Sequence, residues 1–496
     1  MLQNPYTFWF VAGSQHLYGE QALLEVEHHA RSMVNELNKE ANLPFEVKFK
    51  SVLTLDSEIH KLMIEANSSE RCAGLIAWMH TFSPGKMWIN GLAALQKPFL
   101  HLHTQFHRDI PWSSIDMDFM NVNQSAHGDR EFGYTVTRVG LSRKVIAGYW
   151  RHSEVQRRVG QWMQTATAIQ ESRKLKVARF GDNMRSVAVT EGDKVGAHIQ
   201  FGWTVDYYGI GDLVERINEV QEEQVNLLFK EYRELYEIDS QTLNSSSHLE
   251  AIREQARIEL GLKAFLEEGS YTAFTTNFED LHGMKQLPGL AAQRLMADGY
   301  GFAGEGDWKT AALTRLIKGM SHNQSTSFME DYTYHLEPGN EMILGSHMLE
   351  VCPTISSSKP KVVVHPLGIG GKEDPARLLF DGKTGKGIVV SLIDLGGRFR
   401  MVMNEIEAVA SSEKTPNLPV AKMLWKPLPS FSVATEGWIY AGGAHHTVLS
   451  LSVTKEQVMD LAELFKIECV TIDQETRLDR LQQELRINEV VWRMSR

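Results

Sequence analysis

Short apolar runs alternate with longer segments of helical periodicity in the first third of the chain. The pattern predicts strands at 7–13, 45–52, 74–79 and 98–105, and helices at 19–41, 58–66 and 88–96. The helix at 19–41 has an apolar stripe that includes Leu23, Val26 and Met33. Such alternation predicts a parallel sheet with helical crossovers, whose ligands bind beyond the carboxyl ends of the strands.

A second alternating run follows a long helix that we expect at 145–175. Strands are expected at 176–180, at 186–194 together with a turn, at 204–209 and at 272–278. Helices are expected at 225–238, 248–269 and 289–298. This pattern predicts a second doubly wound α/β domain.

From about residue 320 the pattern changes to strand-like segments with short Gly-, Asn- or Pro-bearing links. They lie at 361–367, 376–381, 387–395, 398–409, 420–425 and 446–453, with a hairpin turn expected at 380–385 and helices at 455–466 and 477–492. The fold class is therefore α/β: two doubly wound, Rossmann-like domains followed by an antiparallel, β-rich, barrel-like domain with terminal helices. The predicted domains are 1–175, 176–325 and 326–496.

Composition narrows the classes of function. The 496-residue chain has a net charge of −11 and no dense basic run, which argues against a nucleic-acid partner. No apolar run is long enough to cross a membrane, and the first residues lack the features of a signal peptide. Its three cysteines lie far apart and form no CxxC pair, so neither a disulfide framework nor a thiolate zinc site is expected. We expect a cytoplasmic protein.

The candidate chemistry lies mainly between residues 301 and 353. Glu305 stands between two glycines, Glu330 ends an apolar segment, and His347 precedes a strand-like run. Each has an ordinary structural alternative, such as a capping loop with Asp307 as the cap of the next helix. Taken together, two carboxylates and an imidazole favour a divalent metal site without thiolates, suited to Mn²⁺, Co²⁺, Fe²⁺ or Mg²⁺, with Zn²⁺ possible.

A further imidazole ligand is expected from the pair His445 and His446, which precedes a predicted strand. Because adjacent strand residues point to opposite faces, only one of the two is expected to face the site. Alternation does not say which. No GxGxxG motif follows the first strand, no Walker A spacing is present and no G-x-S-x-G occurs, so the sequence predicts neither a nicotinamide cofactor, nor ATP binding, nor a hydrolase elbow.

Several long segments, in order along the chain, resemble the L-arabinose isomerase family. They are FWFVAGSQHLYGE, WMHTFSPGKMWINGL, HTQFHRDIPW, MNVNQSAHGDREFGY, RFGDNMRSVAVTEGDK, GYGFAGEGDWKTAAL, SFMEDYTYHLEPGNEMILGSHMLEVCP and EGWIYAGGAHHTVLS. The resemblance implies interconversion of L-arabinose and L-ribulose, with conversion of D-galactose to D-tagatose as a side activity. It also implies a homohexamer with active sites at subunit interfaces.

The resemblance also implies the site residues. The metal, Mn²⁺ with Co²⁺ as a possible substitute, is held by Glu305, Glu330, His347 and His446. The sugar pocket takes in Gln15, Leu17, Tyr18, Phe82, Gln124, Met184, Thr275, Phe278, Met348 and Ile369, and His127 matches a residue that reaches a neighbouring subunit's site.

Isomerisation of an aldose to a ketose moves a hydrogen between C2 and C1 and a proton between O1 and O2. We expect an enediol route with Glu305 and Glu330 as acid and base. A metal-assisted hydride shift is the alternative mechanism. Alternative functions are an L-fucose-isomerase-like enzyme, a non-catalytic sugar-binding protein and, more weakly, a zinc hydrolase.

Overall fold

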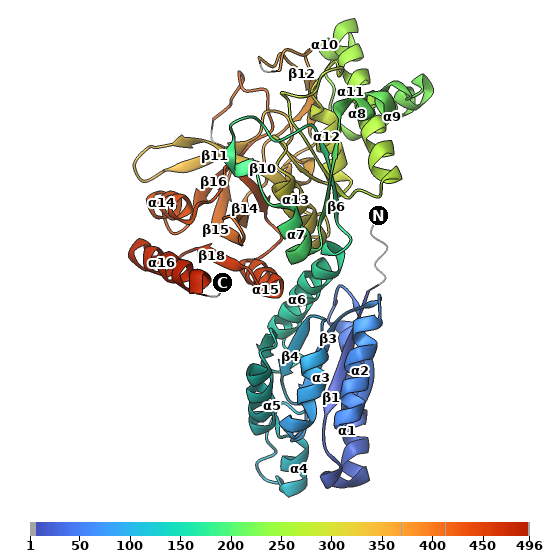
Figure 1. Ribbon diagram of the computed structural model, residues 1–496, viewed down its shortest axis with the longest axis vertical. Helices are drawn as coiled ribbons and strands as arrows, with labels where there is room; N and C mark the ends of the chain where they lie inside the picture. Colours follow the sequence, from blue (N-terminus) through green and yellow to red (C-terminus); the bar gives the residue numbers. More distant parts are fainter. Residues whose placement is uncertain (1–5, 369, 412, 495–496) are drawn as a thin grey trace. The chain divides into compact units, whose positions relative to one another are not determined.

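The computed structural model (Figure 1) describes residues 6–368, 370–411 and 413–494. The chain divides into two compact units, one up to Gln170 and one from Glu171 onward. The division falls inside helix α6 (Ser153–Ser172). The predicted three-domain boundaries at 175 and 325 stay a prediction.

A five-stranded parallel sheet forms the centre of the first unit, in the order β2-β1-β3-β4-β5. Its strands are β1 (Thr7–Gly13), β2 (Glu46–Leu53), β3 (Cys72–Met79), β4 (Phe99–His103) and β5 (Lys144–Ala147). The helices are α1 (Gly19–Glu40), α2 (Asp56–Ser68), α3 (Ile89–Ala94), α4 (Met117–Val122) and α5 (Ser125–Val139), before α6. Every residue of β1 and β3 is buried, which explains why these strands are continuous apolar runs in the sequence.

The second unit begins with a four-stranded parallel sheet, in the order β7-β6-β8-β9. Its strands are β6 (Lys176–Phe180), β7 (Thr204–Tyr208), β8 (Ala273–Thr276) and β9 (Gly301–Ala303). The helices of this part are α7 (Lys194–Phe201), α8 (Ile210–Asn218), α9 (Glu222–Leu235), α10 (Ser240–Leu243), α11 (Ser246–Glu268), α12 (Gly289–Ala297) and α13 (Trp308–Met320).

A mainly antiparallel sheet of seven strands completes the second unit, in the order β14-β17-β10-β11-β16-β15-β18. Its strands are β10 (Thr326–His335), β11 (Met342–Ser346), β14 (Gly385–Asp394), β15 (Phe399–Val409), β16 (Met423–Pro427), β17 (His446–Ser450) and β18 (Glu468–Ile472). Because β14 also pairs with β15, six of these strands close into a barrel, and β18 adds to β15 in parallel. The predicted fold class is confirmed.

The remaining described elements complete the second unit. A separate pair of strands consists of β12 (Lys361–Val364) and β13 (Ala376–Leu379). The late helices are α14 (Phe431–Ala441), α15 (Lys455–Phe465) and α16 (Leu478–Met494).

Three sequence-based predictions of local structure are wrong. The long helix expected at 145–175 begins only at Ser153, because β5 extends the first sheet beside β4. No strand forms within 186–194, where the structure has a short 3-10 turn at Ala188–Thr190. Residues 380–385 are not a hairpin turn, since β13 pairs with β12 and β14 belongs to the barrel.

Among the described residues, no helix is both long and apolar enough to span a membrane.

Candidate metal centre and substrate pocket

Glu305 lies in the tight loop that joins β9 to α13. Its backbone has a φ of 60°, the left-handed region that residues with a side chain seldom adopt. Two backbone hydrogen bonds hold this loop. The Glu305 carbonyl accepts from Met184 N–H at 3.0 Å, and Gly306 N–H donates to the Thr276 carbonyl at 3.1 Å. A left-handed non-glycine residue at such a junction is typical of a functional site.

Asp307 caps α13, as the sequence predicts. One of its carboxylate oxygens accepts from the backbone N–H of Thr310 at 3.2 Å. The other lies 3.1 Å from Nδ1 of His446. Burial alone would raise the pKa of Asp307, but Lys309 and His446 together hold that pKa well below its ordinary value. The buried carboxylate is therefore charged and fixes the His446 ring.

Glu330 and His446 lie directly opposite each other on the paired strands β10 and β17. On the other side of β10, Glu330 is opposite Ser346, the last residue of β11. Directly opposed residues of an antiparallel pair carry their side chains to the same face of the sheet. The barrel therefore places Glu330 beside His446 on one face, and His347 follows immediately after β11.

His347 is held from one side by a carboxylate three residues later in the chain. Its Nδ1 lies 2.6 Å from an oxygen of Glu350, so Nε2 is the nitrogen left to face the site. A Cβ atom on Gly304 would stand 3.0 Å from that Nε2, which shows how closely the Glu305 loop approaches the ring. Burial lowers the pKa of His347, and Glu350, Glu330 and Glu305 together raise it above its ordinary value.

Both members of the His445 and His446 pair face Glu305, contrary to the expectation that only one would. The Nε2 atoms of His445 and His446 lie 3.5 and 3.8 Å from the same Glu305 oxygen. The alternation rule does not apply because β17 begins at His446, and His445 lies in the bend before it. The ligand atoms of Glu305, His445 and His446 all lie within 4.8 Å of one another.

Glu330 and His347 are not members of this tightest group, although both act on it electrostatically. Glu330 contributes to raising the pKa of both His347 and His445. The His347 and His446 rings have centroids 6.0 Å apart. The phenyl ring of Phe328 lies edge-on to both imidazoles, at 5.0 and 5.1 Å. The three residues whose ligand atoms gather here are Glu305, His445 and His446, and the predicted four-ligand set stays a prediction.

Two buried polar atoms fit a cation at this point. Within the part of the chain that the structure describes, Oε2 of Glu305 and Nε2 of His446 are buried and have no hydrogen-bond partner. Burial would raise the pKa of Glu305, but the imidazoles of His445, His446 and His347 lower it below its ordinary value, so the carboxylate is charged. A charged carboxylate oxygen and an imidazole nitrogen without hydrogen-bond partners suit a divalent ion that accepts oxygen and nitrogen ligands.

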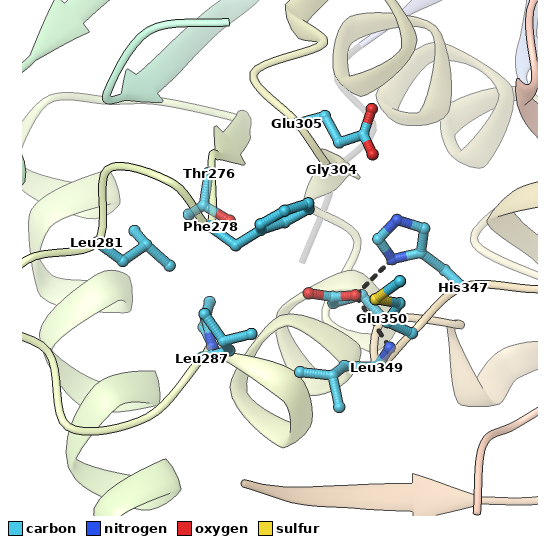
Figure 2. A pocket seen from close by; sticks show the side chains of 11 residues that line it. Thr276, Phe278, Leu281, Leu287, Gly304, Glu305, His347, Leu349 and Glu350 are labelled. Carbon is cyan, nitrogen blue, oxygen red and sulfur yellow. Dashed lines mark hydrogen bonds and ion pairs between the residues drawn. The ribbon is translucent and has the colours of Figure 1, made fainter. Parts of the chain in front are cut away.

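A pocket opens beside Glu305 and His347, with an empty volume of about 370 Å³ that includes its mouth. Phe278 and Met348, two residues of the predicted sugar pocket, line it. Figure 2 shows His347 and Glu350 joined on one side of the pocket, and Leu281 and Leu287 on the other. The sequence prediction omits several lining residues: Thr276, Leu281, Leu287, Pro288, Leu349 and Glu350.

Two more predicted sugar-binding residues lie close to the Glu305 loop. Met184 is half-buried and donates its backbone N–H to Glu305. Thr275 is fully buried, and its hydroxyl donates to the Ala303 carbonyl at 2.7 Å, so this side chain supports the loop. Ile369 lies outside the described residues.

The remaining predicted sugar-binding residues lie in the first unit. Gln15, Leu17 and Tyr18 follow β1, and the Tyr18 hydroxyl donates to the Gln124 side-chain oxygen at 3.3 Å. The side chain of Leu17 is 84% exposed.

Phe82 follows β3 and stacks on the ring of His127, with centroids 5.2 Å apart. The first unit thus has polar and aromatic side chains beyond the carboxyl ends of two neighbouring strands. Parallel sheets bind ligands at this end of their strands.

Comparison with known proteins covers the whole chain. Residues 2–174, 176–323 and 325–468 match the family models described as the L-arabinose isomerase N-terminal, central and C-terminal domains. The chain is 64% identical over 490 residues to an L-arabinose isomerase of Geobacillus stearothermophilus, with 99% of each chain covered. It is 61% identical to that of Halalkalibacterium halodurans and 60% identical to that of Bacillus subtilis, with full coverage of both chains in each case.

Proposed function

This chain belongs to the L-arabinose isomerase family of aldose–ketose isomerases, and we propose that it interconverts L-arabinose and L-ribulose with the help of one bound divalent ion. The proposal includes D-galactose as a second substrate, which gives D-tagatose. It also includes Mn²⁺ as the ion, with Co²⁺ as a substitute, and a cytoplasmic homohexamer with active sites at subunit interfaces.

The observation that carries the proposal is the arrangement of imidazoles and carboxylates around Glu305. Two histidines have Nδ1 beside a carboxylate, His347 beside Glu350 and His446 beside Asp307. Histidine metal ligands in proteins are commonly fixed in this way through their second nitrogen. The resulting site would hold the ion through Glu305, Glu330, His347 and His446, with His445 close enough to replace or join them.

A bound divalent ion would polarise the sugar carbonyl and stabilise negative charge that develops on its oxygens. The protein's own groups supply the proton transfers. In the aldose-to-ketose direction, one carboxylate of the Glu305 and Glu330 pair removes the C2 proton, and the same proton or one from solvent is delivered to C1. The O2 proton is lost and O1 gains one, so the products balance the substrate. A positioned general base of this kind contributes roughly 10²–10⁴-fold to the rate.

The pocket beside the centre suits an extended sugar chain. Phe278, Leu281 and Leu287 form an apolar wall, and Glu305 and His347 provide the polar side. Binding the carbon chain against the wall would present C1 and C2 to the carboxylates and exclude water from the reacting carbons.

The proposal is tested by removing metal with a chelator and restoring Mn²⁺, Co²⁺, Mg²⁺ or Zn²⁺ singly. Ketose formation is then measured with L-arabinose, D-galactose and L-fucose. We expect no turnover without metal and the highest turnover with Mn²⁺ on L-arabinose. A preference for L-fucose would favour the fucose-isomerase-like alternative, and a chelated enzyme with full activity would refute metal dependence.

The proton-transfer route is tested in ²H₂O. A carboxylate base exchanges its proton with solvent, so we expect deuterium at C1 of the L-ribulose formed. Complete retention of a C2 hydrogen label at C1 would instead indicate direct hydrogen transfer between the two carbons.

A further inference from the structure

A second pocket lies at one end of the closed barrel, under helix α14. Its empty volume is about 350 Å³, its mouth included. Strands β10, β11, β14, β15 and β16 and helix α14 contribute its lining, which consists of Asp331, Tyr334, Ile343, Val389, Asn404, Trp425, Pro427, Ala434, Thr435, Trp438 and Ile439. The end of a barrel is a frequent place for small-molecule sites.

This pocket and the candidate metal centre lie on opposite faces of β10. Glu330 faces His446 at the metal centre. Successive strand residues point to opposite faces, so Asp331 is directed to the other side. Met329, which shares that direction, packs in the barrel core with Trp425 and Val389. None of the residues that line the barrel pocket lines the pocket beside Glu305.

Two polar atoms in the barrel pocket are buried without a partner. Among the described residues, neither Oδ1 of Asp331 nor Nε1 of Trp425 has a hydrogen-bond partner. The Trp425 side chain is fully buried, and its ring lies against Gly345, where a Cβ atom would stand 2.1 Å from it. A buried indole N–H normally finds an acceptor, because leaving it unpaired costs free energy.

The two atoms are complementary in kind. The indole of Trp425 can only donate a hydrogen bond, and a carboxylate oxygen of Asp331 accepts one. An ammonium group would leave the indole N–H without an acceptor. A hydroxyl group accepts from the indole and donates to the carboxylate at the same time.

The walls of the pocket are largely apolar and suit the C–H groups of a ligand next to such a hydroxyl. The indole N–H of Trp438 donates to the Ala444 carbonyl at 3.0 Å, so the ring of Trp438 offers the pocket an apolar surface. Tyr334 and Ile439 form the rim and are 47% and 73% exposed, so a ligand can extend outward between them. Aromatic faces beside paired polar groups suit molecules that alternate hydroxyls with carbon-bound hydrogens.

We propose that the barrel pocket is a second small-molecule site, which binds a short neutral polyol through one hydroxyl placed between Trp425 and Asp331. This site shares no lining residue with the pocket beside Glu305, and its test does not depend on the proposed isomerase activity. Its occupant packs its carbon chain against Trp438 and Tyr334.

The test uses erythritol, a four-carbon polyol without a carbonyl group, and the full-length, Mn²⁺-loaded enzyme. Binding is followed by calorimetric titration, and a crystal structure with erythritol locates the bound molecule. We expect density for erythritol in the barrel pocket, and about tenfold weaker binding there in Trp425→Phe, which keeps a ring but loses the donor. Any binding at the metal centre is common to wild type and variant, so the difference between them reports the barrel pocket.

Trp203→Phe is the matched control, because Trp203 is equally buried and its N–H already donates to Ser172 at 2.8 Å. We expect erythritol binding in that variant to equal wild type. Tyr334→Ala, at an exposed rim position, provides a second variant if Trp425→Phe does not fold, and it too is expected to weaken binding. Water alone between Asp331 and Trp425 in the crystal structure, or unchanged binding in the folded variants, would overturn the proposal.

Discussion

At the scale of single residues, the candidate centre depends on which nitrogen of each imidazole is hydrogen-bonded to the protein. Nδ1 of His347 contacts Glu350 and Nδ1 of His446 contacts Asp307, and both carboxylates are buried. A charged acceptor at Nδ1 favours the tautomer with the proton there and leaves Nε2 as a lone-pair donor. These two carboxylates therefore orient two of the proposed ligands.

Glu350→Gln is expected to weaken Mn²⁺ binding about 10- to 100-fold, because the amide still accepts a hydrogen bond but lacks the charge that makes the imidazole a strong ligand. Calorimetric titration of the metal-free protein measures the change. Glu337→Gln is the control, since Glu337 is exposed and bonds only with His335 and Asn340 in the described structure. Equal affinities in the two variants would contradict the role of Glu350.

Glu305→Gln and Glu330→Gln are expected to reduce kcat by about 10²–10⁴-fold or more, since each removes a proposed general acid–base group and a proposed metal ligand. The measurement is turnover of L-arabinose at saturating Mn²⁺, with circular dichroism to verify the fold. A variant that retains near-wild-type turnover would remove that glutamate from the mechanism.

At the scale of elements, the sequence predicts the kinds of structure better than their limits. Continuous apolar runs such as β1 and β3 are fully buried parallel strands and are recognised easily. Segment 144–147 is misassigned because a four-residue edge strand beside a long helix has too few residues to show its period. The expected hairpin at 380–385 has the right turn residues, but strand pairing is decided by distant partners, β12 for one strand and β15 with β17 for the other.

The candidate site can likewise be predicted only in part from the sequence. Glu305, Glu330 and His347 can be selected from loop composition and from the resemblance, and Asp307 from the capping rule. The role of Glu350 cannot, because it depends on the turn after β11 that folds this side chain back onto His347. The position of His445 is missed because strand alternation is applied to both histidines, whereas β17 begins at His446 and His445 lies in the bend before it.

Gly304, in the loop between β9 and α13, provides a further test of the candidate site. Gly304→Ala would place a Cβ atom 2.9 Å from Cε1 of His347, so the ring must move from its position beside Glu305. We expect a marked loss of Mn²⁺ affinity and of kcat with little change in secondary structure. Metal titration and steady-state kinetics measure both.

Gly319→Ala is the matched control for that substitution. Gly319 lies in α13, and the nearest atom to an added Cβ is the end of the Arg315 side chain at 3.8 Å. We expect unchanged metal affinity and, because alanine favours helix, a gain in stability of up to about 1 kcal/mol. If Gly304→Ala binds Mn²⁺ as well as Gly319→Ala does, the close approach of loop and ring has no functional role.

At the scale of the whole molecule, the proposed ligands come from distant parts of one compact unit. Glu305 precedes α13, Glu330 and His347 belong to the β10–β11 region, and His446 begins β17. Figure 1 labels α13, β10 and β11 within the second unit. An ion bound by all of them would link the parallel sheet to the barrel, so metal binding should be coupled to the stability of this unit.

We therefore expect Mn²⁺ to raise the free energy of unfolding by about 2.7 kcal/mol when its free concentration is 100 times the dissociation constant, and the melting temperature to rise with metal concentration. Differential scanning calorimetry of chelated and Mn²⁺-loaded protein measures the shift. His347→Asn, which removes a proposed ligand from the β11 end of the site, should lose most of this increment when its Mn²⁺-loaded form is compared with its own chelated form. The same increase in both proteins would mean that the ion stabilises the chain from another place, and the proposed link between the two sheets would be wrong.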